Sequence, residues 1–194
     1  MPSDATPATF NTSTGIPSGK LGMWIFLGSE VMFFTGLLAG YVVLRTAAPV
    51  WPRGRDILNV PLTGVNTLIL ICSSMLILKG VDAAADGKRR ACSFFLLATL
   101  ALGTIFLAVQ LFEYSQLSGE GFRLTSSLFA SVFYVLTGMH GLHVLAGLIV
   151  IAWTAFGVAR GARVATPERV EAVSLYWHFV DLVWVVLFTS LYLI

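Results

Sequence analysis

The stretch TGMHGLHVLAGLIV, residues 137–150, sets two histidines three residues apart in an apolar run long enough to cross a bilayer. Ionisable side chains at such depth are costly, and they usually face the interior of a protein or water. Glycines let neighbouring membrane helices approach closely. The stretch contains three of them, Gly138, Gly141 and Gly147. It therefore predicts a transmembrane helix whose polar face, with His140 and His143, is buried among other helices.

The composition of the whole chain predicts a membrane protein. Of the 194 residues, 57% are hydrophobic and only 11% are charged, whereas about a quarter of the residues in a soluble domain are charged. The charged residues stand in short blocks between long apolar runs, so they form no separate basic patch for nucleic acid. We therefore expect an all-α, polytopic membrane helix bundle with no nucleic-acid partner.

The chain divides into a polar tail and five apolar segments. Residues 1–19 are rich in Ser, Thr and Pro and lack the apolar core of a signal peptide, which predicts a flexible N-terminal tail. Residues 20–194 are expected to form one transmembrane domain. Five segments have roughly the 20 mostly apolar residues that a spanning helix needs. They lie at about residues 21–44, 62–78, 91–114, 127–158 and 172–194.

The basic residues are distributed unevenly between the two ends of these segments. If the N-terminus is cytoplasmic, the inner side holds Lys20, Lys79, Lys88, Arg89, Arg90, Arg160, Arg163 and Arg169. The outer side holds only Arg45, Arg53, Arg55 and Arg123. Because cytoplasmic loops of membrane proteins carry an excess of Lys and Arg, this bias predicts a cytoplasmic N-terminus and a periplasmic C-terminus.

Ionisable residues on three predicted helices lie at a similar depth. At 1.5 Å per helical residue, Glu30 and His143 lie roughly 15 Å and 13 Å from the cytoplasmic boundary, and Asp181 is nearly level with them. His140 is one turn from His143 and His178 is one turn from Asp181, each pair on one helix face. The sequence predicts a buried polar cluster of these five residues. Two roles remain open, a set of helix-packing contacts or a site that holds a proton.

A fourth acidic position, Glu113, lies in QLFEYSQL at the predicted outer end of its helix. The membrane interface offers water at that level. We expect Glu113 to contact Arg45 or Arg123 there and to have a structural role.

No bound metal or haem is predicted for this chain. Two histidines three residues apart on one helix cannot supply the two axial ligands of one haem, which come from opposite faces. His178 is the only further histidine, and no CxxC spacing indicates a zinc site. Cys72 and Cys92 are expected to be small buried hydrophobes and not a disulfide. The buried chemistry is therefore expected to be protonic.

Four motifs, in this order, resemble subunit III of haem–copper terminal oxidases. They are SEVMFFTG (29–36), EY (113–114), TGMHGLHV (137–144) and YWHFVDLVW (176–184). The resemblance runs from about Lys20 to the C-terminus. It implies a non-catalytic subunit that carries no redox centre, with the haems and copper in the partner subunit I.

The resemblance also implies roles for the subunit and for its buried residues. The family's roles are to stabilise subunit I through turnover, to bind phospholipid between helices, and to support proton uptake near the cytoplasmic entrance of subunit I. Glu30 matches the family's membrane-buried carboxylate. The histidine and aspartate positions of the two longer motifs are matched by His140, His143, His178 and Asp181.

The chain departs from the mitochondrial-type member of the family in length. That member has seven spans, and its two N-terminal helices form one wall of a lipid-filled cleft. Here the first span corresponds to the third of that form, which is the short five-helix bacterial pattern. A cleft of that kind would then need a wall from another subunit.

The first and last motifs are closest in wording to the cytochrome c oxidase type. Quinol-type relatives tend to have Asp at the position of Glu30 and Phe at that of Tyr176. The resemblance therefore implies a proton-translocating cytochrome c oxidase of the bacterial cytoplasmic (inner) membrane. The implied partners are subunit I, subunit II, small subunits, and a cytochrome c or an upstream respiratory complex. The alternatives are subunit III of a quinol oxidase, an accessory subunit of a nitric oxide reductase, or a small proton-coupled transporter.

Overall fold

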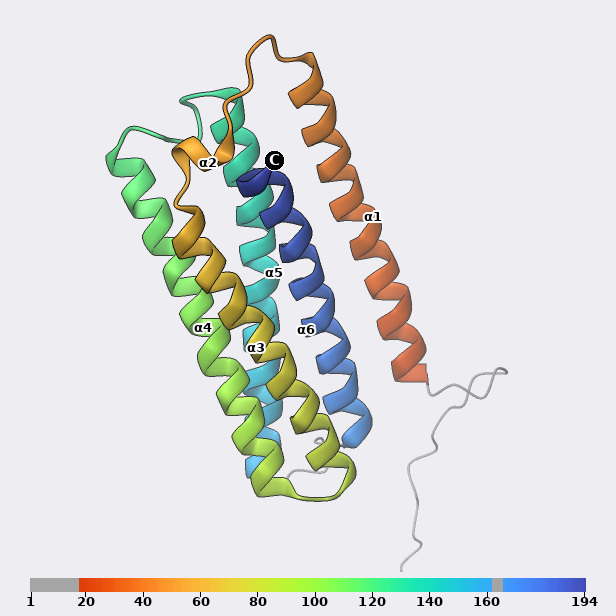
Figure 1. Cartoon of the computed structure of the whole chain (residues 1–194). Coiled ribbons are helices and arrows are strands. Elements are labelled where there is room, and N and C mark those ends of the chain that lie inside the picture. The colour runs from red at the N-terminus through yellow and green to blue at the C-terminus, as the bar shows by residue number, and fades with distance from the viewer. Residues whose placement is uncertain (1–17, 162–165) are drawn as a thin grey trace, which may run out of the picture.

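The computed structural model describes residues 18–161 and 166–194, and within these residues the chain is helical without strands. Five helices are long and apolar enough to cross a membrane, the last of them continued by a short π-helix. This confirms the all-α architecture with five candidate spans (Figure 1). In chain order the elements are α1 (Ser18–Ala47), α2 (Gly54–Ile57), α3 (Val60–Ala85), α4 (Arg89–Gly119), α5 (Leu128–Ala159), α6 (Pro167–Phe188) and the π-helix η1 (Thr189–Leu193).

Most helices extend beyond their predicted ends, because a count of apolar residues finds only the part that needs a hydrocarbon environment. The α3 helix begins where Asn59 accepts a hydrogen bond from the Leu62 amide, and α5 begins where Ser127 caps the Ala130 amide, each at 3.1 Å. The short α2 helix was not predicted. The predicted tail, residues 1–19, lies outside the described residues except for positions 18 and 19, which belong to α1.

Helices α3, α4, α5 and α6 form a four-helix bundle, and α1 packs on its side against α6 and α5 (Figure 1). The core of the bundle is aromatic. The fully buried Trp177 ring of α6 lies against Gly103 of α4 and Gly147 of α5, where a Cβ atom would come within 2.7 Å and 2.9 Å of the ring. The indole N–H donates to Ser73 Oγ of α3 at 2.9 Å, so this one residue contacts all three neighbouring helices.

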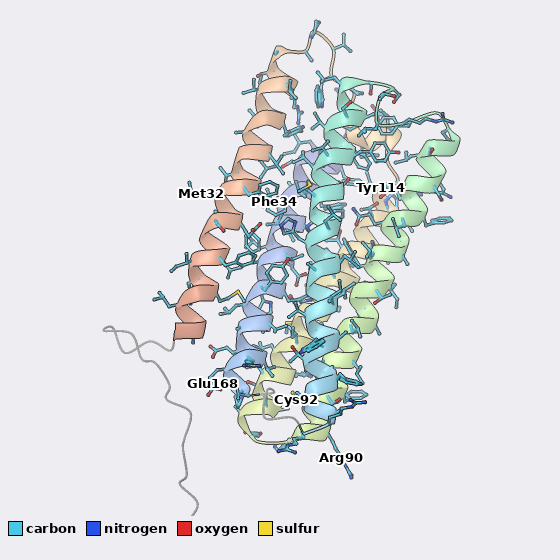
Figure 2. The ribbon with its side chains drawn as sticks, turned by 180° about the vertical axis from the view of Figure 1, so that it is seen from behind. Met32, Phe34, Arg90, Cys92, Tyr114 and Glu168 are labelled. Atoms are coloured by element: carbon cyan, nitrogen blue, oxygen red, sulfur yellow. The ribbon has the colours of Figure 1, made fainter. Side chains whose placement is uncertain are left out.

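The α1 helix meets the bundle along one narrow seam. Leu27, Phe34 and Tyr41, each seven residues apart, are its buried apolar side chains, whereas most others on α1 are exposed. This spacing is the seam of a coiled-coil contact. In Figure 2, Phe34 points toward the bundle and Met32 points away from it.

The molecule has two ends, which we name by their contents. The basic end holds the start of α1, the α3–α4 connection and the start of α6, with Lys88, Arg89 and Arg90 among its residues. The α2 end holds the α1–α3 and α4–α5 connections and the π-helix η1 (Figure 1). Arg163, one of the basic residues counted for orientation, lies outside the described residues.

Candidate functional site

Glu30 of α1 and His143 of α5 form a direct pair midway along the bundle. Glu30 Oε2 lies 2.9 Å from His143 Nε2, and each side chain is 17% exposed. The other imidazole nitrogen, Nδ1, lies 2.7 Å from the carbonyl oxygen of Met139. The Phe34 ring meets the imidazole edge-on at 4.9 Å, and the Tyr176 hydroxyl donates to the His143 carbonyl at 3.0 Å. The pair therefore links α1 to the bundle in a mostly apolar setting.

The hydrogen-bond partners of His143 define how many protons the pair holds. A carbonyl oxygen only accepts hydrogen bonds, so Nδ1 of His143 must carry a hydrogen to bond Met139. The bond between Nε2 and Glu30 then needs one more proton, which belongs either to the carboxyl group or to the imidazole ring. In both arrangements the pair has no net charge, which lowers the cost of burying it in a membrane.

Asp181 belongs to a different group from the one predicted by depth. Its Oδ2 accepts a hydrogen bond from the Ser74 hydroxyl of α3, and Ser74 Oγ lies 2.9 Å from His178 Nδ1. Four of the five residues of the predicted cluster therefore form two separate groups. Glu30 pairs with His143, and Ser74 links Asp181 to His178. Depth along the membrane normal is similar for both, but α6 turns Asp181 toward α3 and not toward α1.

His140 is also separate from His143, although only one turn lies between them. Its ring is fully buried and stacks on Trp184 of α6, with 4.9 Å between ring centroids and 28° between planes. The Phe106 ring of α4 meets it edge-on at 6.0 Å. Neither ring nitrogen has a hydrogen-bond partner among the described residues. The prediction that the two histidines share one polar face is wrong, because His140 faces α4 and α6 and His143 faces α1.

Glu113 is buried inside the bundle and does not contact an arginine. Only 4% of it is exposed, and its carboxylate accepts hydrogen bonds from Thr63 Oγ1 at 3.0 Å and from the Tyr192 hydroxyl at 2.9 Å. The predicted contact with Arg45 or Arg123 is wrong. The reason is that α4 continues to Gly119, so Glu113 lies within the helix, facing α3 and η1.

The two predicted arginines make other contacts at the α2 end. Arg45 donates to the Tyr41 hydroxyl at 2.6 Å and to the Ile194 carbonyl at 3.1 Å, and Tyr41 in turn donates to the Ser190 carbonyl at 2.7 Å. The Arg123 backbone amide donates to Ser126 Oγ at 3.2 Å in the α4–α5 connection. Arg45 and Tyr41 therefore tie the end of α1 to η1 and to Ile194, which follows it.

A third polar contact fixes α1 at the basic end. Lys20 Nζ lies 2.6 Å from Glu171 Oε1 of α6, with both side chains partly exposed. The α1 helix is thus held at three levels, by Lys20, by Glu30 and by Arg45. The hydroxyl partners Thr63, Ser74 and Tyr192 were not predicted, because hydroxyl groups are common in membrane helices and carry no depth cost that singles them out.

The cysteines and acidic residues offer no cation site in the part of the chain that is described. Within residues 18–161 and 166–194, no group of three or more His, Cys, Asp or Glu side chains is arranged to hold a metal ion. Cys92 is buried as expected, whereas Cys72 is exposed on the surface of α3, so its predicted burial is wrong. Both thiols are free.

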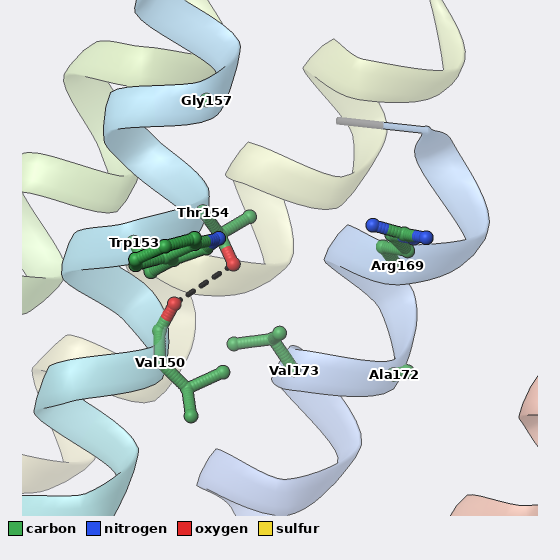
Figure 3. A pocket seen from close by; sticks show the side chains of 7 residues that line it. All are labelled: Val150, Trp153, Thr154, Gly157, Arg169, Ala172 and Val173. Atoms are coloured by element: carbon green, nitrogen blue, oxygen red, sulfur yellow. Dashed lines mark hydrogen bonds between the residues drawn. The ribbon is translucent and has the colours of Figure 1, made fainter. Parts of the chain in front are cut away.

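A groove of about 230 Å³ lies between α5 and α6 at the basic end (Figure 3). Its walls are mostly apolar, and the Arg169 guanidinium stands at its side. The Thr154 hydroxyl donates to the Val150 carbonyl at 2.8 Å and so offers no free donor to the groove. An apolar groove with one cation suits an acyl chain whose headgroup is anionic. The groove is lined by Val150, Trp153, Thr154, Gly157, Arg169, Ala172 and Val173.

Comparison with known proteins shows the same family over almost the whole chain. The family model described as cytochrome c oxidase subunit III matches residues 5–194. Cytochrome c oxidase subunit 3 of Synechocystis sp. is 40% identical over 97% of this chain and 82% of its own length. The probable cytochrome c oxidase subunit 3 of Nocardia farcinica is 41% identical over 90% and 87%. Cytochrome bo(3) ubiquinol oxidase subunit 3 of Pseudomonas putida is 36% identical over 90% and 84%.

Proposed function

The chain belongs to the cytochrome c oxidase subunit III family, and on that premise we propose that it is a non-catalytic subunit of a bacterial cytochrome c oxidase. In this role it packs beside subunit I, which carries the haems and copper, within a complex that also contains subunit II. Small subunits and a cytochrome c or an upstream respiratory complex complete the set of partners. The chain itself contributes no redox centre.

The pairing of Glu30 with His143 carries this proposal. A redox site needs ligands left free to bind a cofactor, but these two residues bind each other, at 2.9 Å. Hydrogen bonds within the bundle engage His178, Glu113 and one oxygen of Asp181, and aromatic rings enclose His140. Such contacts order helices and do not ligate metals. They support a role in stabilising subunit I by a rigid neighbouring bundle.

Support for proton uptake is a second part of the proposal, and it rests on the same pair. Glu30 and His143 hold one proton between them and are partly exposed on the side of the bundle, next to α1. A hydrogen-bonded carboxyl–imidazole pair at the side of the bundle is suited to a place next to a partner's proton entrance. A role in phospholipid binding is supported by the α5–α6 groove with Arg169.

We propose that the basic end faces the cytoplasm and that the complex lies in the inner membrane. The positive-inside rule supports this orientation, since seven of the eleven Lys and Arg residues that the structure describes lie toward the basic end. In this arrangement Glu113 and the η1 helix lie toward the periplasm.

Cytochrome c is the proposed electron donor, on the wording of the SEVMFFTG and YWHFVDLVW motifs. The second candidate is a quinol oxidase, and it is favoured by the similarity to the Pseudomonas putida subunit. The two differ in the substrate that the whole complex oxidises.

Purification of the tagged chain from its native membranes tests the proposal. We expect haem-containing subunits to copurify and the preparation to oxidise reduced cytochrome c faster than quinol. The Glu30→Ala variant should retain the haem spectrum and the initial rate, but lose activity sooner during sustained turnover. Copurification without any haem subunit, or loss of haem on the single substitution, would contradict a non-catalytic role in an oxidase.

A further inference from the structure

A second groove, of about 360 Å³, lies between α4 and α5 at the basic end and shares no lining residue with the α5–α6 groove. Arg89 and Arg90 form its rim, and its lower walls are apolar. We propose that this groove binds a phospholipid with a net negative headgroup. The proposal does not depend on the electron donor or on the catalytic partner. The full lining is Arg89, Arg90, Ser93, Phe94, Leu97, Val158 and Ala159.

The order of side chains along α4 matches an amphiphile aligned with the membrane normal. The 31 residues of α4 span roughly 46 Å, more than the ~30 Å hydrocarbon layer, so its first turn reaches the headgroup level. Arg89 and Arg90 stand in that turn, whereas Leu97 lies about 12 Å further along the helix. Phe94 and Leu97 are 65% and 53% exposed, so the described part of the chain leaves them open. The groove therefore offers a cationic site above an apolar one.

The position of Arg89 is fixed by a glycine across the groove. Gly161, in the turn after α5, has a φ of +64°, which a residue with a side chain adopts only under strain. A Cβ atom there would come within 2.5 Å of Arg89 Nη1. The guanidinium therefore lies against the end of α5 and closes the headgroup end of the groove. Figure 2 shows Arg90 at the same end of the molecule, extending away from the bundle.

The charge at this groove selects a negative headgroup over a zwitterionic one. No acidic residue is among its lining residues. The carboxylate closest in sequence, Asp86, is occupied by Lys88 at 2.8 Å, and this hydrogen bond raises the pKa of the Lys88 ammonium. The headgroup of phosphatidylcholine would bring its own cation to two arginines. A headgroup with only a phosphate charge meets no such repulsion, and an arginine fork binds phosphate oxygens in pairs.

Photolabelling of the chain in its native complex tests this assignment. The tagged protein is purified with its partners, reconstituted in phosphatidylcholine vesicles, and irradiated with either photoactivatable phosphatidylglycerol or photoactivatable phosphatidylcholine. We expect adducts on residues 93–97 and 158–159. Their yield should be about tenfold higher with the phosphatidylglycerol probe than with the phosphatidylcholine probe. Equal labelling by the two probes would overturn the proposal.

Charge-changing variants separate this site from the general attraction of the surface. R89Q/R90Q should reduce the labelling to the phosphatidylcholine level, whereas R89K/R90K should keep most of it. The matched control R53Q/R55Q, at the α2 end, should leave it unchanged. Unaltered labelling in R89Q/R90Q, or an equal loss in the control, would contradict the assignment. Excess inorganic phosphate should not displace the lipid, and displacement by phosphate alone would indicate a simple anion site.

Discussion

At the scale of single residues, Glu30 is the hydrogen-bond partner of the Nε2 atom of His143. His143 Nδ1 is engaged by the Met139 carbonyl, so Nε2 depends on Glu30. Glu30→Ala leaves Nε2 unpaired in a mostly enclosed side chain, whereas the amide of Glu30→Gln can donate to it. We expect Glu30→Ala to lower the free energy of unfolding by about 1–2 kcal/mol and Glu30→Gln by less than half as much, measured by denaturation of the purified protein in detergent.

The matched control for this prediction is Glu120→Ala. Glu120 is an exposed carboxylate that follows α4, so its removal should change the stability by less than about 0.5 kcal/mol. If the two variants had the same free energy of unfolding, the hydrogen-bonded pair of Glu30 and His143 would contribute nothing to the stability of the fold.

A second residue prediction concerns the buried carboxylate of Glu113. The Tyr192 hydroxyl satisfies one of its oxygens, and Thr63 satisfies the other. Tyr192→Phe leaves a charged or polar oxygen without a donor inside the bundle, so we expect a loss of about 1–3 kcal/mol in thermal or chemical unfolding. Tyr134→Phe is the comparison, because its hydroxyl donates to a backbone carbonyl in a partly exposed connection. A larger loss for Tyr134→Phe would refute this account of Glu113.

Residue types and depths predict which polar groups are buried but not which ones meet. The sequence placed Glu30, His143 and Asp181 at one level, and the first two do bind each other. Asp181 does not join them, because depth says nothing about the direction in which a side chain leaves its helix. That direction depends on which helices are neighbours. The partner of Asp181, Ser74, is an ordinary hydroxyl in an apolar run and gave no signal of its own.

At the scale of helices, close packing depends on a particular glycine of α5. A Cβ atom at Gly147 would lie 2.9 Å from the buried Trp177 ring, whereas one at Gly138 would meet nothing within 4 Å. Gly147→Ala forces the indole or the helix to move, and such overpacking costs about 1–3 kcal/mol. Gly138→Ala should be neutral or slightly stabilising, because alanine favours helix. Comparison of the two melting temperatures tests this, and equal effects would exclude the packing argument.

The attachment of α1 is the element-level feature that the sequence could have revealed. Leu27, Phe34 and Tyr41 repeat every seven residues and face the bundle, and this period is visible in the sequence. Apolar length alone does not reveal this period, since most positions of the helix are apolar. Apolar length also predicted that α4 ends near residue 114, whereas the helix continues to Gly119. Glu113 was therefore predicted at the membrane interface, although it is buried in the bundle.

At the scale of the whole molecule, the sequence predicted five spans, and the structure has five helices able to cross a membrane. Their number follows from hydrophobic length alone, which is why it was accessible without knowledge of contacts. The position of α1 beside α6 and α5 was not accessible, because it depends on the close packing of side chains and on the polar contacts of Lys20, Glu30 and Arg45.

The orientation of the molecule in its membrane yields the last prediction. Around the α3–α4 connection, Lys88, Arg89 and Arg90 follow one another and are offset by one acidic residue, Asp86. In the loop at the α2 end, only Arg53 and Arg55 stand against one acidic residue, Asp56. Because short basic connections stay in the cytoplasm, a cysteine introduced at Asp86 should resist a membrane-impermeant thiol reagent in intact cells, and one introduced at Arg53 should react. Both are placed in a background without Cys72 and Cys92, and both should react after the membrane is permeabilised. Labelling in the opposite pattern would reverse the orientation, and would place the groove of Arg89 and Arg90 against the outer leaflet.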